Sequence, residues 1–194
     1  MKNKLVIFIL ISLLSTFATN AQFNKREKRF LQWFLKGYKQ SKYPVFYLKN
    51  QDNGQLLQVL KPDSLLDMWG IAGRNKSQNK LILTKKEKKY VAAEINQLKS
   101  INWVDHLLPG TRLLSQDTAN YYLIDRFQGW QKLYKRGITG FYTFSKPVFL
   151  RNETICIFQY DFNCGYLCGD GTIMVYIKEN GKWAPYINLA NWVS

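Results

Sequence analysis

The chain has 194 residues, a formal net charge of +15, and 12 Phe, 12 Tyr and 6 Trp side chains. This length and aromatic content favour one packed domain over a disordered chain. With one histidine and three cysteines, the composition also leaves little room for a metal site built from these residue types.

The first 21 residues have the three parts of a secretory signal peptide. Lys2 and Lys4 provide a positive start, a short apolar run follows, and small residues precede a cleavage point expected between Ala21 and Gln22. The apolar run is shorter than the roughly 20 residues that a spanning helix needs. We therefore expect residues 22–194 to form a single secreted domain, periplasmic or extracellular, with no transmembrane segment.

Export also limits which anionic partners the positively charged protein can meet. Loss of Lys2 and Lys4 lowers the net charge from +15 to +13. In a cytosolic protein such a charge would point first to nucleic acid. An exported protein instead meets anionic surface polymers, lipid headgroups and acidic proteins, and we expect no nucleic-acid partner.

The mature chain is predicted to begin with an amphipathic helix over Gln22–Tyr43. Phe30, Phe34 and Tyr38 recur at helical spacing, and Pro44 ends the segment. A basic helix of this kind can lie on a membrane surface. A wide aromatic stripe more often docks on the domain's own core, and both interpretations stay open at this point.

The next segments carry weaker patterns. Short strands are predicted for Val45–Leu48 and Gln55–Leu60 around a turn at 52–54, followed by a helical turn at Asp63–Trp69. The short apolar run Leu81–Leu83 fits a strand or a helix equally well.

Two further helices have terminal signals. Thr84 and Glu87 have the spacing of a capping box, which predicts a helix from there to about residue 99. Phe127–Arg136 is predicted to be helical, with Gly137 as its C-terminal cap. A cluster of lysines on the first of these helices is interpreted as a solvated face, with a binding patch as the alternative. The cluster consists of Lys85, Lys86, Lys88 and Lys89.

From residue 140 onward the pattern changes to a period of two. Asn180-Gly181 is a strong hairpin signal, and Pro185, which has no N–H to donate, favours an edge position for the last strand. The predicted class is therefore α+β, with N-terminal and middle helices packed on a C-terminal antiparallel β-meander of about three to four strands. The segments 141–144 and 148–150 come before a turn, 154–163 is predicted as a long strand, and 172–178 and 183–188 follow on either side of Asn180-Gly181.

Two of the three cysteines lie in the segment CGYLCGDG. In an exported protein Cys164 and Cys168 are expected to form a disulfide across one turn. Cys156 lies earlier on the same predicted strand, too far from Cys164 to bond, so we expect a buried free thiol. The interleaved glycines indicate a backbone that turns tightly or is closely approached by another group. They are Gly165, Gly169 and Gly171.

No catalytic residue, metal site or cofactor is predicted. Disulfide oxidoreductases use C-x-x-C at a helix start, whereas this pair is C-x-x-x-C between strands. Zinc would require His106 to join Cys164 and Cys168, and no spacing places them together. A cysteine hydrolase that uses Cys164 or Cys168 with His106 is kept as an alternative.

About a quarter of the chain carries four short motifs, FS-x-P-x-F, CG-x-LCG-x-G, G-K-W and W-[IV]-S. With these motifs it resembles the C-terminal region of small exported proteins of Bacteroidota and related bacteria, a group without an assigned activity. The resemblance implies export and a shared fold, and it implies no reaction. The matching segments are Phe144–Phe149, Cys164–Gly171, Gly181–Trp183 and Trp192–Ser194, with Gly129, Trp130 and Tyr134 similar upstream.

Three functional hypotheses follow. The first is a secreted, non-catalytic binding or interaction domain that presents the disulfide loop and aromatic strand ends beside a basic surface. The second is the cysteine-dependent hydrolase. The third is a basic binder of membranes or anionic polymers that uses the first helix.

Overall fold

A computed structural model describes residues 23–36, 44–49, 54–70, 80–97 and 105–194. The predicted signal peptide, both ends of the first predicted helix and the turn at 52–53 lie outside these residues. In the described part of the chain, no helix is long and apolar enough to cross a membrane.

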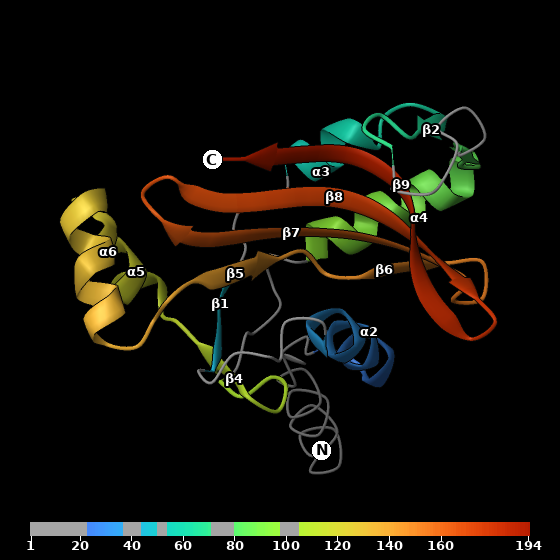
Figure 1. Cartoon of the computed structure of the whole chain (residues 1–194). Coiled ribbons are helices and arrows are strands. Elements are labelled where there is room, and N and C mark those ends of the chain that lie inside the picture. Colours follow the sequence, from blue (N-terminus) through green and yellow to red (C-terminus); the bar gives the residue numbers. More distant parts are fainter. Residues whose placement is uncertain (1–22, 37–43, 50–53, 71–79, 98–104) are drawn as a thin grey trace, which may run out of the picture.

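The described residues form helices and short strands in the first part of the chain and five consecutive strands in the last part (Figure 1). The helices are α2 (Lys25–Lys36), α3 (Gly54–Val59), α4 (Lys85–Asn96), α5 (Gln116–Leu123) and α6 (Arg126–Lys135). The strands of the first half are β1 (Val45–Lys49), β2 (Ser64–Leu66), β3 (Lys80–Ile82) and β4 (Thr111–Leu113). The later strands are β5 (Phe141–Phe144), β6 (Val148–Leu150), β7 (Ile155–Gly165), β8 (Cys168–Glu179) and β9 (Lys182–Val193).

A mixed sheet of seven strands is the centre of the fold. Its order is β4-β1-β5-β7-β8-β9, with β6 also paired to β7, while β2 and β3 form a separate two-stranded sheet. The α+β class is therefore confirmed, and β7, β8 and β9 pair antiparallel as expected. The sheet is larger than the predicted meander because β1 pairs in parallel with both β4 and β5.

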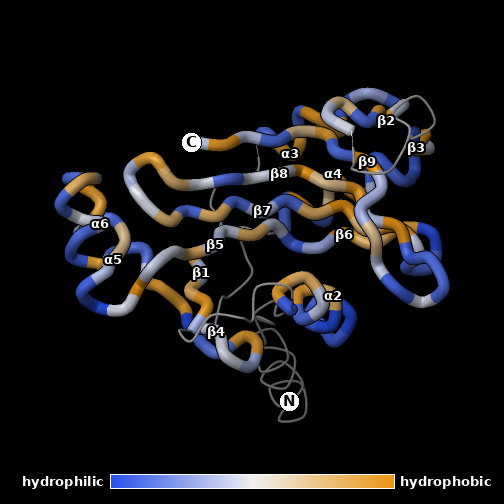
Figure 2. The backbone as a smooth tube through the Cα atoms, viewed as in Figure 1, coloured by the Kyte–Doolittle hydropathy of each residue, from blue (hydrophilic) through white to orange (hydrophobic). Residues whose placement is uncertain are grey.

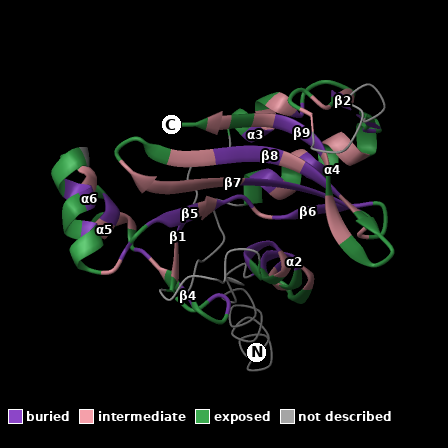
Figure 3. Ribbon diagram, viewed as in Figure 1, coloured by how far each residue is buried: buried purple, intermediate pink, exposed green. Residues whose placement is uncertain are grey.

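The two faces of this sheet bury different kinds of side chain. Along β7, Cys156 and Phe158 join an aromatic cluster under α2, whereas Ile155 and Ile157 join an aliphatic cluster with residues of α3 and α4. Successive side chains of a strand point to opposite faces, so one strand serves both cores. Figure 3 shows that the first half of β7 and the middle of β8 are buried.

The first predicted helix packs against the aromatic face. Phe30 and Phe34 of α2 are buried and contact the ring of Phe158, with centroids 5.2 and 5.1 Å apart. Asn24 and Glu27 cap the helix, because each side chain accepts a hydrogen bond from the other residue's backbone N–H. Docking on the domain's own core is thus confirmed, and Figure 2 shows the hydrophobic side of α2 turned toward the sheet.

Two of the short predictions are wrong. Gln55–Leu60, expected as a strand, forms α3, because Leu56 and Leu60 are one helical turn apart and both are buried in the aliphatic core. The expected helical turn at Asp63–Trp69 contains β2, which pairs with β3 so that Leu65 is buried and Leu66 exposed.

The terminal signals hold. The Thr84–Glu87 capping box is present at the start of α4. Gly137 follows α6 with a positive φ of 75°, as expected of a C-terminal cap. Asn180 and Gly181 both have positive φ in the β8–β9 turn, and Pro185 lies on the edge strand β9. The short helix α5, capped by the Ser115 side chain, was not predicted.

Candidate functional site

The turn between β7 and β8 is closed by a disulfide. Cys164 and Cys168 are bonded with their Cα atoms 5.1 Å apart, as the sequence predicts. The bridge joins the end of one long strand to the start of the next, so it clamps the tip of the β7–β8 hairpin. Tyr166 and Leu167, between the two cysteines, are 56% and 77% exposed. The disulfide therefore holds two large apolar side chains out in solvent.

The glycines of this hairpin are explained by Trp192. Gly171 pairs with Asp161 on one side and with Trp192 on the other, and the indole crosses the glycine to donate a 2.8 Å hydrogen bond from Nε1 to Asp161 Oδ1. A Cβ on Gly171 would overlap both of these atoms, and one on Gly169 would lie 3.1 Å from the indole. Both residues lie within β8, and this strand needs glycine at these positions because the aromatic ring of Trp192 covers its backbone.

Helix α6 braces the same turn. The Tyr134 hydroxyl donates a hydrogen bond to the Cys164 carbonyl, and a Cβ on Gly165 would lie 2.9 Å from that hydroxyl. Gly129 lets α6 approach α5 closely, since a Cβ there would overlap the Tyr122 carbonyl. The residues of the CG-x-LCG-x-G and W-[IV]-S motifs thus meet Trp130 and Tyr134 of α6 at one end of the molecule, which we call the disulfide end.

A cleft of about 420 Å³ opens at the disulfide end. Trp130 forms part of its wall and stacks on Phe141 at a centroid distance of 5.6 Å and an interplanar angle of 8°. The remaining wall combines backbone and amide groups with the disulfide, so the lining is both polar and apolar. Other lining residues are Leu123, Asn163, Tyr166, Cys168 and Trp192.

No family model, curated protein or solved structure matches this chain.

His106 lies away from the disulfide end. It belongs to the turn before β4, and β4 is separated from β7 by β1 and β5 in the sheet. Its exposed imidazole Nε2 lies 3.6 Å from Asp105 Oδ2. Hydrogen bonds from the backbone N–H of Leu113 and of His106 lower the pKa of Asp105. Asp105 thus organises the turn, and the structure does not bring His106 to either cysteine of the disulfide.

Cys156 is the buried free thiol that the strand register predicts. Burial raises its pKa well above the usual value, which disfavours the nucleophilic thiolate. Together with the bonded state of Cys164 and Cys168, this leaves no cysteine of the described residues as a free, exposed thiol.

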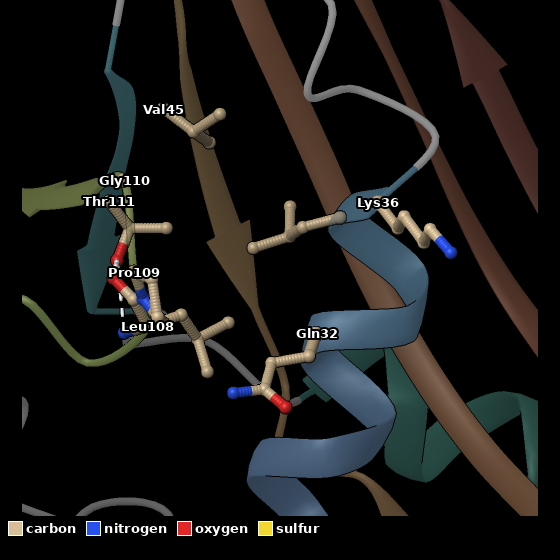
Figure 4. Close-up of a pocket in the computed structure, with 8 residues that line it drawn as sticks. Gln32, Lys36, Val45, Leu108, Pro109, Gly110 and Thr111 are labelled. Carbon is tan, nitrogen blue, oxygen red and sulfur yellow. Dashed lines mark hydrogen bonds between the residues drawn. The ribbon is translucent and has the colours of Figure 1, made fainter.

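A second cavity, of about 290 Å³, lies between α2 and the loop before β4 (Figure 4). Gln32 of α2 points toward Leu108 and Pro109 across it, whereas the Lys36 side chain points away from them. The chain leaves the described residues just after Lys36, at the edge of this cavity, and no role is assigned to it.

Proposed function

We propose that the protein is a secreted, non-catalytic binding domain that recognises a partner protein through its disulfide end. The supporting observation is the exposure of Tyr166 and Leu167 on a turn that is covalently closed and braced from two sides. Large apolar side chains held rigidly at a protein surface are typical centres of binding energy, because little freedom is lost when a partner covers them.

The surroundings of the turn extend this surface. Ile124 and Phe127, at the junction of α5 and α6, are 85% and 64% exposed. They follow Leu123, which lines the cleft beside Tyr166. Exposed apolar side chains gathered beside a cleft are typical of an interaction site, whereas single exposed apolar residues scattered over a surface are not.

The cysteine hydrolase fits this geometry less well. Both sulfur atoms of the turn are committed to the bond, and His106 lies beyond two intervening strands. A hydrolytic role would require the bond to be reduced and a different base to be supplied.

Site-directed photo-crosslinking in the producing cell tests the proposal. Leu167 is replaced by p-benzoylphenylalanine, and Lys86, an exposed residue on α4, receives the same replacement as a matched control. We expect one discrete heavier adduct from position 167 and none from position 86. The partner protein found in this adduct should bind the wild-type protein. It should not bind a Tyr166→Ser, Leu167→Ser variant whose thermal unfolding is unchanged. No adduct at position 167, or identical adducts at both positions, would overturn the proposal.

A further inference from the structure

Another cleft, of about 270 Å³, lies at the end of the long strands opposite to the disulfide end. It is enclosed by α2 and the β8–β9 turn, which lie side by side in Figure 1, far from the β7–β8 turn. Two arginines come from the helix, two lysines from the hairpin, and each element adds an indole. We call it the basic cleft, and its defining residues are Arg26, Arg29, Trp33, Lys178, Lys182 and Trp183.

The positive charge of the basic cleft is poorly neutralised by the protein. Glu153 is the acidic residue among those that line it, and its Oε1 lies 3.7 Å from Arg26 Nη1. Both side chains are partly exposed, so this ion pair is weak. The buried Arg26 Nε has no hydrogen-bond partner among the described residues. A buried N–H without a partner is costly, so the described part of the protein does not fully satisfy this guanidinium.

The acidic residue of α2 itself is unavailable to these cations. Glu27 is 1% exposed, accepts a hydrogen bond from Asn24 N, and lies 3.5 Å from Lys146 Nζ. Lys25 and Lys28 add further positive charge along the same stretch of helix. The charge therefore continues beyond the cavity, which suits a polymer with repeated negative groups better than a single small anion.

Aromatic rings stand next to the cations. The Arg26 guanidinium lies 5.2 Å from the centroid of Phe149, and Lys178 Nζ lies 5.5 Å from the centroid of Trp183. Cation–π contacts of this kind position the charges without neutralising them. A ring face beside a cation suits a sugar that carries an acidic group, because its C–H face can lie on the indole while its anionic oxygens meet the cation.

We propose that the basic cleft binds an acidic polysaccharide, one sugar residue at a time, with its carboxylate or sulfate held by the arginines and lysines. The volume agrees with this size of ligand, since it is below the roughly 300–1,000 Å³ of pockets that enclose larger organic ligands. This activity is independent of the protein interface proposed at the disulfide end.

The proposal is tested by measuring, with calorimetry at low salt, how tightly the purified protein binds polygalacturonate. An Arg29→Gln, Lys182→Gln variant removes two exposed charges at the cleft. A Lys85→Gln, Lys86→Gln variant removes the same charge from the exposed face of α4. We expect affinity to fall by at least about tenfold in the first variant and by less than about threefold in the second.

Three further probes identify the ligand class. Neutral dextran and polyacrylate, an anionic polymer without sugar rings, should bind at least about tenfold more weakly than polygalacturonate. Any binding of the protein to phosphatidylglycerol vesicles should be the same in the wild-type protein and in the cleft variant. Equal losses in the two variants would show diffuse charge attraction. Tight polyacrylate binding would exclude a role for the sugar ring, and cleft-dependent vesicle binding without polygalacturonate binding would assign the site to lipid. Each of these outcomes overturns the proposal.

Discussion

The Trp192 indole occupies the space above the backbone of Gly171, its partner on the neighbouring strand. From there it reaches Asp161 on the strand beyond, so one hydrogen bond of 2.8 Å spans three strands of the sheet. Only a residue without a side chain on the middle strand permits this bridge. The pairing shows that this motif glycine and tryptophan form one structural unit, which supports the disulfide end.

A Gly171→Ala substitution should destabilise the protein by about 1–3 kcal/mol, because the new methyl group must displace the indole or the strand. Urea unfolding measures this loss. The matched test is a double-mutant cycle with Trp192→Leu, in which the cost of the alanine should fall by at least about 1 kcal/mol. An equal cost in both backgrounds would show that the indole is not the obstacle.

The disulfide should contribute local rigidity more than global stability. For so short a loop, the chain-entropy model gives about 2 kcal/mol, so a Cys164→Ser, Cys168→Ser variant should fold and unfold at lower urea concentration. Mass spectrometry of the exported protein under thiol-blocking conditions should find the bond intact. Two blocked thiols in place of the bond would contradict the structure.

Removal of Lys146 should be more damaging than removal of the disulfide. Its Nζ lies 2.6 Å from Glu94 Oε2 and 3.5 Å from Glu27 Oε1, and it links α2 on one face of the sheet to α4 on the other. Lys146→Met leaves two carboxylates without their cation, and we expect a loss of about 3–5 kcal/mol in urea unfolding. Lys85→Met, at an exposed position, should change stability by less than about 0.5 kcal/mol. Similar small effects for both would show that the network carries little energy.

The ionisation of Glu87 should make the free energy of unfolding depend on pH. Hydrogen bonds from Arg151 and from the Thr84 backbone lower its pKa from 4.5 to about 2. A carboxylate with a lowered pKa in the folded state stabilises the protein above the unfolded-state pKa, and that contribution is lost as the pH falls toward about 2. Because Arg151 is partly exposed, we expect about 1 kcal/mol.

The measurement is the difference in unfolding free energy between the wild-type protein and Glu87→Gln, which preserves a capping side chain. The difference should be largest near pH 6 and should narrow below about pH 4.5. A difference that stays constant over this range would show that the charge of Glu87 is not involved.

Local signals predicted the elements that contain them. The Thr84–Glu87 box, the Asn180-Gly181 turn and the alternation along 154–163 each depend on a few neighbouring residues, and each is present in the structure. Gln55–Leu60 failed for the opposite reason, since a short apolar run fits either period until the core that buries Leu56 is known. The edge position of Pro185 could be predicted because its missing N–H is a local property.

The sequence by itself determined the α+β class, the cysteine pair and the isolation of Cys156, because periodicity, turn chemistry and strand register are encoded over short stretches of chain. Only the tertiary structure decided that β1 joins β5 in parallel, that Trp192 covers Gly171, and that α2 and the β8–β9 turn share a basic cleft. Those contacts join residues far apart in the chain. They depend on which faces pack together, and no local pattern encodes that choice.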